Sequence, residues 1–594
     1  MKQILTISIL VIYTLFLSSC TEDWLKPKPL SFYAPENVLV DELGFKSLLV
    51  TMRRDLREDS FYDERCMFAN EYIMSDLGVG GNSNNQITKD FVLQLTPAGD
   101  GGILNFYQLF DKSYTAIKTT NLLISRIDNV KWKEQTLRDE ILAEAYFFRS
   151  YWYYRLVNAF GDVPFTGKEL SNAKLDFFTH SRWSILKKII SDMEFAVEKL
   201  PVTAVPGAVT RGAGNHLLTK LYLSNSEFDK AIISASKVIN GPYALMKNRF
   251  GSSANDPKRN VVWDLFRPEN ISLPANTETL LAVVDRYEAP IEAKTLGCKK
   301  PRIFNCNWWS PRVLDSKGKN GTIASGAMYD SLLRGNANCR PTPFYVYEIW
   351  NDGANNWRKT SDLRRSDICW VNKEELLYNR TTSVDYGKPI NPNYFSLKED
   401  TFQFYYSFPH YKTYYPEQNP AVSPPTGGNG DNYIFRLAET YLLRAEAYYW
   451  KGDLVNSARD INEVRGRVKA NPVLPGSITI DYIMDERVRE LWSEEPRHNE
   501  LTRVSYIMAK NNIGGYSLSN FSEHNYFYDR VIKNNVFYRT NISYAGYSYR
   551  LAPWHVLWPI PATVITANTM GVINQNQGYY GTELNKPPLE TIEE

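Results

Sequence analysis

Residues 138–165, RDEILAEAYFFRSYWYYRLVNAFGDVPF, carry the pattern that decides the fold. Apolar residues recur at steps of three and four, which places them on one face of an α-helix. They are Ile141, Ala145, Phe148, Trp152 and Leu156. Gly161 then provides a helix C-cap, and Pro164 prevents the helix from continuing. The stretch therefore predicts a helix with one apolar face that must be covered by another element.

Further helices follow in pairs joined by short turns. The same three- and four-residue spacing predicts helices over residues 182–200, 216–224, 228–239, 433–450 and 454–468. Pro201 stops the first of them, and Lys451-Gly452-Asp453 forms the turn between the last two. The small side chain of Ala458 allows its partner helix to approach closely. Four tryptophans on these helical patterns are expected to pack in the core: Trp152, Trp183, Trp450 and Trp492.

These helix–turn–helix units resemble tetratricopeptide repeats without the strict repeat consensus. One set lies before residue 245 and another after residue 430. Between them, residues 251–430 are rich in Gly, Asn, Pro and aromatic residues, with short strand-like runs such as residues 279–285. We therefore predict a mainly α fold: a tetratricopeptide-like helical-hairpin scaffold with a loop-rich inserted lobe that carries short strands. Binding residues are expected on such loops.

The N-terminal residues predict export and lipid anchoring. Lys2 precedes an apolar run over residues 4–17, and Leu17-Ser18-Ser19 leads directly into Cys20. This is the pattern of a lipoprotein signal peptide over residues 1–19, so the mature chain is expected to begin at an acylated Cys20. The alternative is a transmembrane anchor, but the run is short for a membrane span.

Composition narrows the classes of function. The 594 residues carry a formal net charge of +2 and no dense run of Lys and Arg, which argues against nucleic-acid binding. Aromatic residues make up 14% of the chain, with 39 Tyr and 14 Trp. Besides packing in a core, rings in this number suit contact with a polar ligand.

The cysteines give no sign of a metal site, because none forms a C-x-x-C pair. With Cys20 acylated, an odd number remains, so at least one cysteine must be free or pair between chains. One or two disulfides are possible among Cys298, Cys306, Cys339 and Cys369; Cys66 is the fifth cysteine. No cofactor is expected.

Several motifs together resemble the SusD/RagB family of outer-membrane nutrient-binding lipoproteins. Besides the lipobox at Cys20, they are Phe160-Gly161-Asp162-Val163-Pro164, Asp362-Leu363-Arg364, the RLAETYLLRAEA run at residues 436–447, INEVRGR at 461–467, DERVREL at 485–491, and Pro559-Ile560-Pro561 with QNQGY at 575–579. The chain departs from the family pattern at Glu495-Pro496 and at Gln577, where a proline is usual. The resemblance divides the chain into an N-terminal part over residues 20–250, a ligand lobe over residues 251–430 and a C-terminal part over residues 431–594.

The resemblance implies a lid on a transporter. Family members lie over a SusC-like, TonB-dependent outer-membrane transporter and capture a glycan, with peptide or another nutrient as the alternative ligand. Glu22-Asp23, just after Cys20, is similar to the surface-export signal of such lipoproteins. The protein is therefore expected at the outer membrane, held by lipid and facing the cell exterior. A structural lid with a degenerate ligand site is a further possibility.

Candidate ligand residues combine aromatic rings, which stack on the apolar faces of sugars, with polar groups that bind hydroxyls. In the middle lobe they are Trp308, Trp309, Trp357, Trp350, Tyr347, Asn307, Asn356 and Arg358. Adjacent residues of a strand point to opposite faces, so one ring of Trp308-Trp309 is expected to be exposed. The Gly- and Asn-rich run over residues 76–86 adds Asn82 and Asn84.

A surface glycoside hydrolase is the less favoured alternative. Such enzymes need an acid and a second carboxylate, which Asp485-Glu486 or Glu494-Glu495 would have to supply. Adjacent helical residues point in different directions, so we expect these carboxylates to lie on solvated faces or to pair with arginines. No catalytic residue is therefore predicted.

Overall fold

The computed structural model describes residues 35–62, 67–82, 88–99, 104–170, 172–353, 356–419 and 427–593. The predicted signal peptide, Cys20 and Asn84 lie outside the described residues. No helix within the described ranges is both long enough and apolar enough to cross a membrane.

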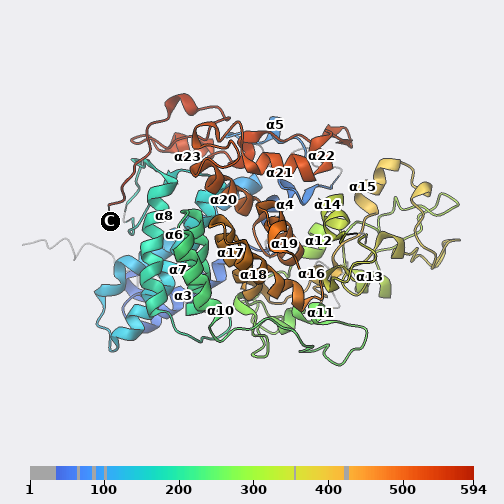
Figure 1. The fold of residues 1–594 in the computed structure, drawn as a ribbon, viewed down its shortest axis with the longest axis horizontal. Helices are drawn as coiled ribbons and strands as arrows, with labels where there is room; N and C mark the ends of the chain where they lie inside the picture. The colour runs from blue at the N-terminus through green and yellow to red at the C-terminus, as the bar shows by residue number, and fades with distance from the viewer. Residues whose placement is uncertain are drawn as a thin grey trace, which may run out of the picture.

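The helices of the N-terminal part lie side by side in a stack (Figure 1). Each packs against the next along the chain, from α6 through α7, α8 and α9 to α10, and α3 covers α6 and α7. Their bounds are Glu42–Asp55 for α3, Leu104–Arg126 for α6, Gln135–Ala159 for α7, Arg182–Lys199 for α8, Arg211–Ser224 for α9 and Phe228–Ile239 for α10. The helix predicted within residues 138–165 is α7, in the middle of this stack. It ends at Ala159, with Phe160 at the C-cap and Gly161, the predicted cap, following at a φ of +69°.

The C-terminal helices continue the same stack. Helix α10 packs on α17 (Leu437–Trp450), which packs on α18 (Leu454–Arg467) and α19 (Ile480–Leu491). Helices α20 (Arg497–Lys510) and α21 (Tyr526–Asn534) complete the scaffold, and α20 also contacts α7. The predicted scaffold of helical hairpins, built from both halves of the chain, is confirmed.

The middle of the chain projects to one side of this scaffold as loops with short helices, among them α13 (Ala327–Leu332) and α15 (Thr401–Phe404) (Figure 1). Strand β4 (Thr279–Val283) confirms the predicted strand-like run at residues 279–285. It pairs antiparallel with β6 (Asn432–Arg436), with Thr279 opposite Arg436 and Val283 opposite Asn432. The predicted helix start at Tyr433 is therefore wrong, because the backbone there bonds to β4 and α17 begins only at Leu437.

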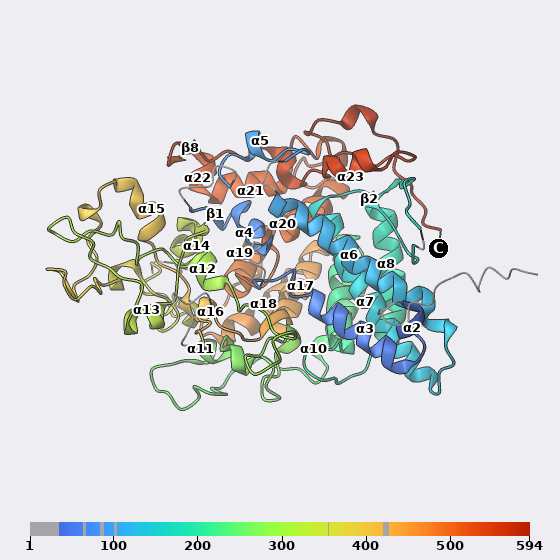
Figure 2. The same ribbon diagram turned by 180° about the vertical axis from the view of Figure 1, so that it is seen from behind.

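A second strand pair joins the run at residues 76–86 to the middle lobe. Strand β1 (Gly78–Gly80) pairs antiparallel with β5 (Cys339–Pro341), and Figure 2 shows β1 beside helix α14 (Pro343–Val346). A Cβ on Gly78 would lie 2.6 Å from Cys339 Sγ, so glycine permits this approach. Two segments that sequence analysis singled out separately are therefore neighbours in space.

The aromatic residues of the middle lobe divide between two cores. Tyr345, Trp350 and Trp370 belong to the main core, which runs through the helical scaffold. An outer group forms a second core of its own: Cys306, Trp308, Val313, Tyr329, Ala337, Val371, Leu376, Tyr378, Ile390, Phe395, Phe404, Tyr406 and Phe408. The lobe is thus partly an extension of the scaffold and partly a separately packed unit.

The cysteines in the described ranges are buried free thiols: Cys298, Cys306, Cys339 and Cys369. The disulfides left open by sequence analysis are therefore not formed among these four. Each thiol is enclosed in its own surroundings; Cys369, for example, lies 3.7 Å from the side chain of Asn260. Burial raises the pKa of Cys298 to about 11 and that of Cys306 to about 12, which keeps both thiols protonated.

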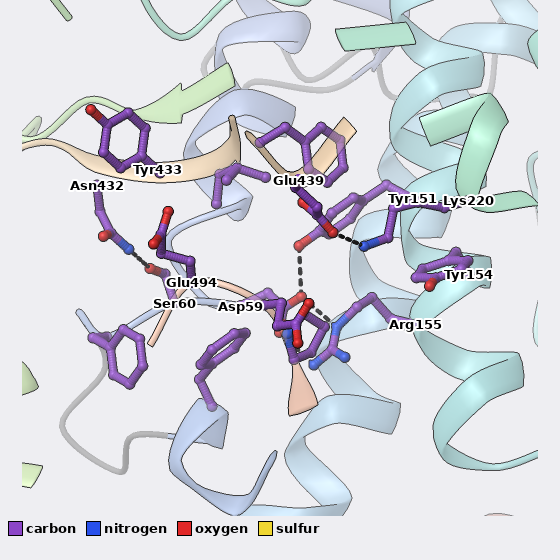
Figure 3. A pocket seen from close by; sticks show the side chains of 16 residues that line it. Asp59, Ser60, Tyr151, Tyr154, Arg155, Lys220, Asn432, Tyr433, Glu439 and Glu494 are labelled. Atoms are coloured by element: carbon purple, nitrogen blue, oxygen red, sulfur yellow. Dashed lines mark hydrogen bonds and ion pairs between the residues drawn. The ribbon is translucent and has the colours of Figure 1, made fainter. Parts of the chain in front are cut away.

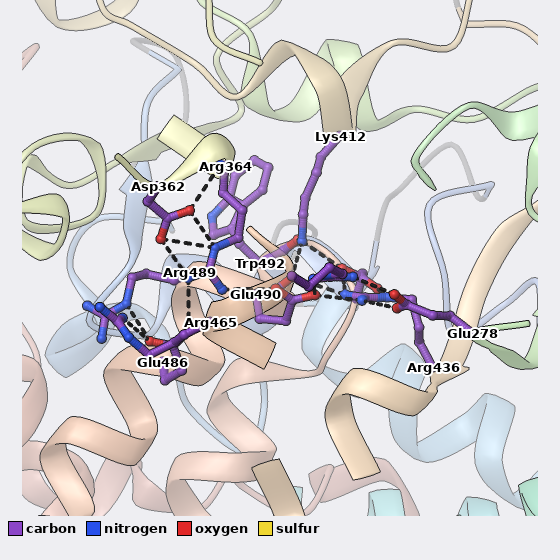
Figure 4. A network of polar contacts seen from close by, with 12 residues as sticks. Glu278, Asp362, Arg364, Lys412, Arg436, Arg465, Glu486, Arg489, Glu490 and Trp492 are labelled. Atoms are coloured by element: carbon purple, nitrogen blue, oxygen red, sulfur yellow. Dashed lines mark hydrogen bonds and ion pairs between the residues drawn. The ribbon is translucent and has the colours of Figure 1, made fainter. Parts of the chain in front are cut away.

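A buried ion network fastens the middle lobe to the scaffold (Figure 4). Arg364, from the lobe, pairs with Glu486 at 2.8 Å and with Glu490 at 2.9 Å, both on α19. Arg436, at the end of β6, pairs with Glu490 at 2.6 Å and with Glu278 at 2.9 Å. Because these charges are shielded from water, each must be matched by partners of opposite charge.

The arginines of the network favour the charged form of Glu490. Burial by itself raises the pKa of Glu490, but the guanidiniums of Arg467, Arg436 and Arg364 outweigh it and hold that pKa well below its usual range. The same arginines belong to the motifs that resemble the SusD/RagB family. The three motifs that carry these arginines therefore meet at Glu490 of α19.

Candidate functional site

Two of the candidate tryptophans are enclosed. Trp308 is 0% exposed within the second core, and Trp350 is 2% exposed. The Trp350 indole N–H donates to Tyr345 O at 2.7 Å, and its ring meets Trp370 edge to face at 6.2 Å between centroids. Neither ring presents a face to solvent in this structure, so both act as packing residues here.

Trp309 and Asn307 lie half-buried at the edge of the second core. The Trp309 indole N–H donates to Gly335 O at 2.9 Å, and its ring meets Tyr329 edge to face at 5.8 Å. The two neighbouring tryptophans thus separate, one inside and one at the surface. Asn307 Oδ1 accepts no hydrogen bond from the described residues.

Trp357 and Tyr347 form an aromatic pair at the surface, with ring centroids 5.2 Å apart. The guanidiniums of Arg358 and Arg365 lie 4.1 and 4.2 Å from the centre of the Trp357 ring. Asn356 is exposed, and its side-chain oxygen accepts a hydrogen bond from the Arg358 backbone N–H at 3.1 Å. Four candidates therefore meet here, and we call these four residues and Arg365 the Trp357 cluster.

The run at residues 76–86 reaches the same lobe through the β1–β5 pair. Gly81 N–H donates to Asn338 O at 3.2 Å, which places half-buried Asn82 beside the segment that leads to Tyr347. Of the two amide candidates in this run, Asn82 is thus positioned at the lobe, and Asn84 falls outside the described residues.

Sequence analysis missed a group of rings near Arg340 of β5. Phe402 stacks on Tyr544 at 4.5 Å, and the guanidinium of Arg340 lies 4.0 Å from the Phe402 ring. Lys89 lies 5.2 Å from the rings of both Tyr544 and Tyr547. The available signal was the run SYAGYS at residues 543–548, in which a short hairpin, β7 (Ser543–Tyr544) and β8 (Tyr547–Ser548), places tyrosines on either side of its turn.

An internal cavity at the centre of the scaffold offers a different kind of site (Figure 3). Asp59 accepts hydrogen bonds from Tyr151 Oη at 2.8 Å and Arg155 Nε at 2.6 Å, and Lys220 pairs with Glu439 at 2.5 Å. The space open to the centre of a water molecule is about 20 Å³. That is room for one water and not for a sugar, so this cavity belongs to the packing of the scaffold.

The carboxylate pairs of the hydrolase alternative are engaged in ion pairs. Glu486 pairs with Arg465 at 2.8 Å, Glu494 with Arg436 at 2.9 Å, and Asp485 with Arg530 at 2.5 Å. The guanidiniums of Arg364, Arg489 and Arg465 overcome burial and lower the pKa of Glu486.

Glu495 behaves differently from its neighbours. Burial raises its pKa, yet it pairs with Arg487 at 2.5 Å beside the small cavity. A glycosidase needs two carboxylates on either side of a bound sugar, which none of these positions provides. The expectation that these carboxylates pair with arginines is confirmed.

The fold and the lobe define a class of protein: a stack of helical hairpins with an aromatic-rich insert at one side. Family models cover both halves of the chain, "SusD family" over residues 327–579 and "Starch-binding associating with outer membrane" over residues 42–223. The chain belongs to the SusD/RagB family.

Three relatives illustrate the match. SusD-like protein P2 of Formosa agariphila is 26% identical over 236 residues, which span 39% of this chain and 45% of that protein. Starch-binding protein SusD of Bacteroides thetaiotaomicron is 24% identical and aligns over 75% of this chain and 73% of its own length. Surface glycan-binding protein A of the same species, in complex with laminarihexaose, shares the fold with a TM-score of 0.61 at 17% identity, covering 90% of this chain and 99% of that one.

Proposed function

We propose that this protein is a cell-surface lipoprotein that captures a glycan and delivers it to a SusC-like, TonB-dependent outer-membrane transporter, over which it acts as a lid. Membership of the SusD/RagB family supports this role, as do the names of relatives that bind starch or a laminarin oligosaccharide. Acyl chains on Cys20 would hold it at the outer membrane, facing the cell exterior. Peptide or another nutrient is the alternative ligand in the same role.

The observation that carries the proposal is the Trp357 cluster. Half-buried Trp357 and Tyr347 offer aromatic surface, and exposed Asn356 and Arg358 offer an amide and a guanidinium. A sugar presents both an apolar ring face and hydroxyls, so this combination suits it. We propose Trp357, Tyr347, Asn356 and Arg358 as the centre of the ligand surface, with Asn82, Trp309 and Asn307 at its edges.

The test is titration calorimetry of the mature protein with a panel of laminari-, malto- and xylo-oligosaccharides and a mixture of short peptides. Trp357→Ala is expected to weaken binding of the preferred glycan about tenfold, because an aromatic contact worth about 1.4 kcal/mol is removed. Trp450→Ala, which removes a half-buried indole from α17 in the scaffold, is the matched control and is expected to bind normally.

Two results would overturn the proposal. Binding of no glycan on the panel would leave the surface without its ligand, and binding of peptides alone would select the alternative.

For the transporter, the protein is expected to co-purify with an outer-membrane barrel from its native membrane. Uptake of the bound glycan that is unchanged when this barrel is deleted would contradict delivery.

A further inference from the structure

A second pocket lies in the helical scaffold, formed from elements other than the middle lobe. Its walls come from the start of α8, the last turns of α20 and the C-terminal residues 554–588, which run beside α8 through the bridge between His180 and Leu589 (Figure 1). Its volume is about 460 Å³. Pockets that hold small ligands have volumes of roughly 300–1,000 Å³, so this space suffices for one sugar ring. We call it the C-terminal pocket.

Aromatic rings form one wall of the C-terminal pocket. Tyr506 stacks on Phe521 with centroids 4.2 Å apart, and Trp183 meets Tyr506 edge to face at 5.9 Å. Trp554 is held by the backbone of Gly578, where φ is +92° and a Cβ would lie 2.4 Å from the indole. Trp183 and Trp554 are half-buried, although sequence analysis placed Trp183 in the core. Both tryptophans therefore belong to the lining of the pocket.

Arg182 contributes a buried cation to the lining with part of its hydrogen-bonding capacity unused. Nη1 donates to Val157 O at 2.8 Å and to Asn158 Oδ1 at 2.9 Å. Nε and Nη2, which form the other edge of the guanidinium, donate to no atom of the described residues, although the side chain is only 1% exposed. Both atoms are enclosed, and the guanidinium lies 4.2 Å from the centre of the Tyr506 ring, so Arg182 places a positive charge behind the aromatic wall of the pocket.

Two more polar groups of the lining can form further hydrogen bonds. Asp162 Oδ1 accepts the Arg182 backbone N–H at 2.7 Å, and no described residue donates to Oδ2. The hydroxyl of Tyr506 likewise has no hydrogen-bond partner within the described ranges. A carboxylate and a phenol therefore line the pocket together with two tryptophans, and Arg182 adds a positive charge behind them.

We propose that the C-terminal pocket binds a single uncharged pyranose ring, at a site separate from the Trp357 cluster. The ring would lie against Trp183 and Trp554, donate hydrogen bonds from its hydroxyls to Asp162 and accept a hydrogen bond from Tyr506 Oη. A neutral sugar suits the pocket better than an acidic one, because a sugar carboxylate would meet the carboxylate of Asp162. The Arg182 guanidinium is enclosed, and Lys586, the other cation of the lining, is exposed and screened by water. This site does not depend on the proposed glycan surface of the lobe.

Titration of the protein with the methyl glycosides of glucose, galactose, mannose and xylose tests this, with tryptophan fluorescence and calorimetry as readouts. We expect at least one glycoside to bind. Tyr506→Phe, which removes only the hydroxyl, is expected to weaken binding about fivefold, and Asp162→Asn to weaken it about tenfold. Tyr516→Phe, whose hydroxyl bonds to Asp529 outside the pocket, is the matched control.

The outcomes separate this site from the lobe. Binding that falls in Tyr506→Phe and Asp162→Asn but is unchanged in Trp357→Ala supports the C-terminal pocket. If no glycoside binds below about 10 mM, or if binding is unchanged in both pocket variants, the inference fails, whatever the result for oligosaccharides at the lobe. Glucuronate binding more tightly than methyl glucoside would overturn the assignment to an uncharged ring.

Discussion

At the scale of single residues, the buried arginines show how charge is accommodated in this protein. Arg364 is 1% exposed and bonds to Asp362 at 2.6 Å as well as to Glu486 and Glu490. Replacing it with leucine would leave carboxylates buried with fewer cations, at a cost of about 3–5 kcal/mol. We expect Arg364→Leu to lower the free energy of unfolding by that amount, as measured by denaturant titration.

Lys230→Leu is the control for Arg364. Lys230 pairs with Glu227 at 2.8 Å but is 54% exposed, so water screens the pair. Its loss is expected to change the free energy of unfolding by less than about 1 kcal/mol. Equal losses of unfolding free energy in the two variants would show that the buried network stabilises the protein no more than a surface ion pair does.

Buried histidines predict how stability depends on pH. Burial, followed by the charges of Arg267 and Arg259, lowers the pKa of His410 to about 3, and burial lowers that of His498 to about 4. In the unfolded chain both titrate near 6.5. Below that pH the unfolded state binds protons that the folded state does not, so stability is lost as the pH falls from about 6.5 toward 4.

The variant His410→Phe tests this at one site. It keeps an aromatic ring beside Trp263 and Tyr414 but removes the titrating group. The slope of unfolding free energy against pH between 6 and 4.5 is expected to fall by about 1.4 kcal/mol per pH unit. Above pH 7.5 the two curves should run parallel, and identical slopes at low pH would mean that His410 is protonated in the folded protein.

At the scale of elements, small residues set the distance between helices. Ala458 on α18 is 2% exposed in the core between α17 and α18, next to Ser457, whose hydroxyl donates to Ala445 O at 2.8 Å. A larger side chain at Ala458 must push the helices apart. Ala458→Leu is expected to lower the thermal midpoint by several degrees, corresponding to about 1–3 kcal/mol.

Val455→Leu, on the same helix, is the matched control for Ala458, because Val455 is 68% exposed. It adds one methylene at the surface and is expected to leave the midpoint unchanged. A crystal structure of Ala458→Leu should show α17 and α18 further apart; an unchanged midpoint would mean that the interface has spare room.

The helices could be predicted because their signals are local. Apolar spacing and stop residues such as Pro201 lie within the element they define. Residues 433–436 contain the same kind of apolar residues, yet they form β6, because their backbone partner β4 lies about 150 residues earlier. A pattern within one segment carries no information about such a partner, so the start of α17 was assigned too early.

The candidate site shows the same limit at the scale of the whole molecule. Trp308 and Trp309 are equivalent by sequence, and long-range packing alone decides that Trp308 is enclosed, among others by Phe404 and Phe408. Trp357 could be predicted at the surface because its neighbours Asn356 and Arg358 are polar. Tyr544 was not selected, because it lies far along the chain from Phe402 of the lobe, on which it stacks; Tyr547 pairs with Tyr544 in the same hairpin.

The two cores lead to a prediction about the whole molecule. Trp308 is fully buried in the second core, and truncating it to alanine removes about 3–5 kcal/mol of packing. Because that core is separate from the one within the helices, we expect Trp308→Ala to raise hydrogen exchange of residues 305–313 and 371–378 while α7 and α8 keep their protection. Trp152→Ala, at 1% exposure on α7, is the matched control and should raise exchange through α6, α7 and α8. If Trp308→Ala raised exchange in α7 to the same extent, the outer lobe and the scaffold would unfold as one cooperative unit.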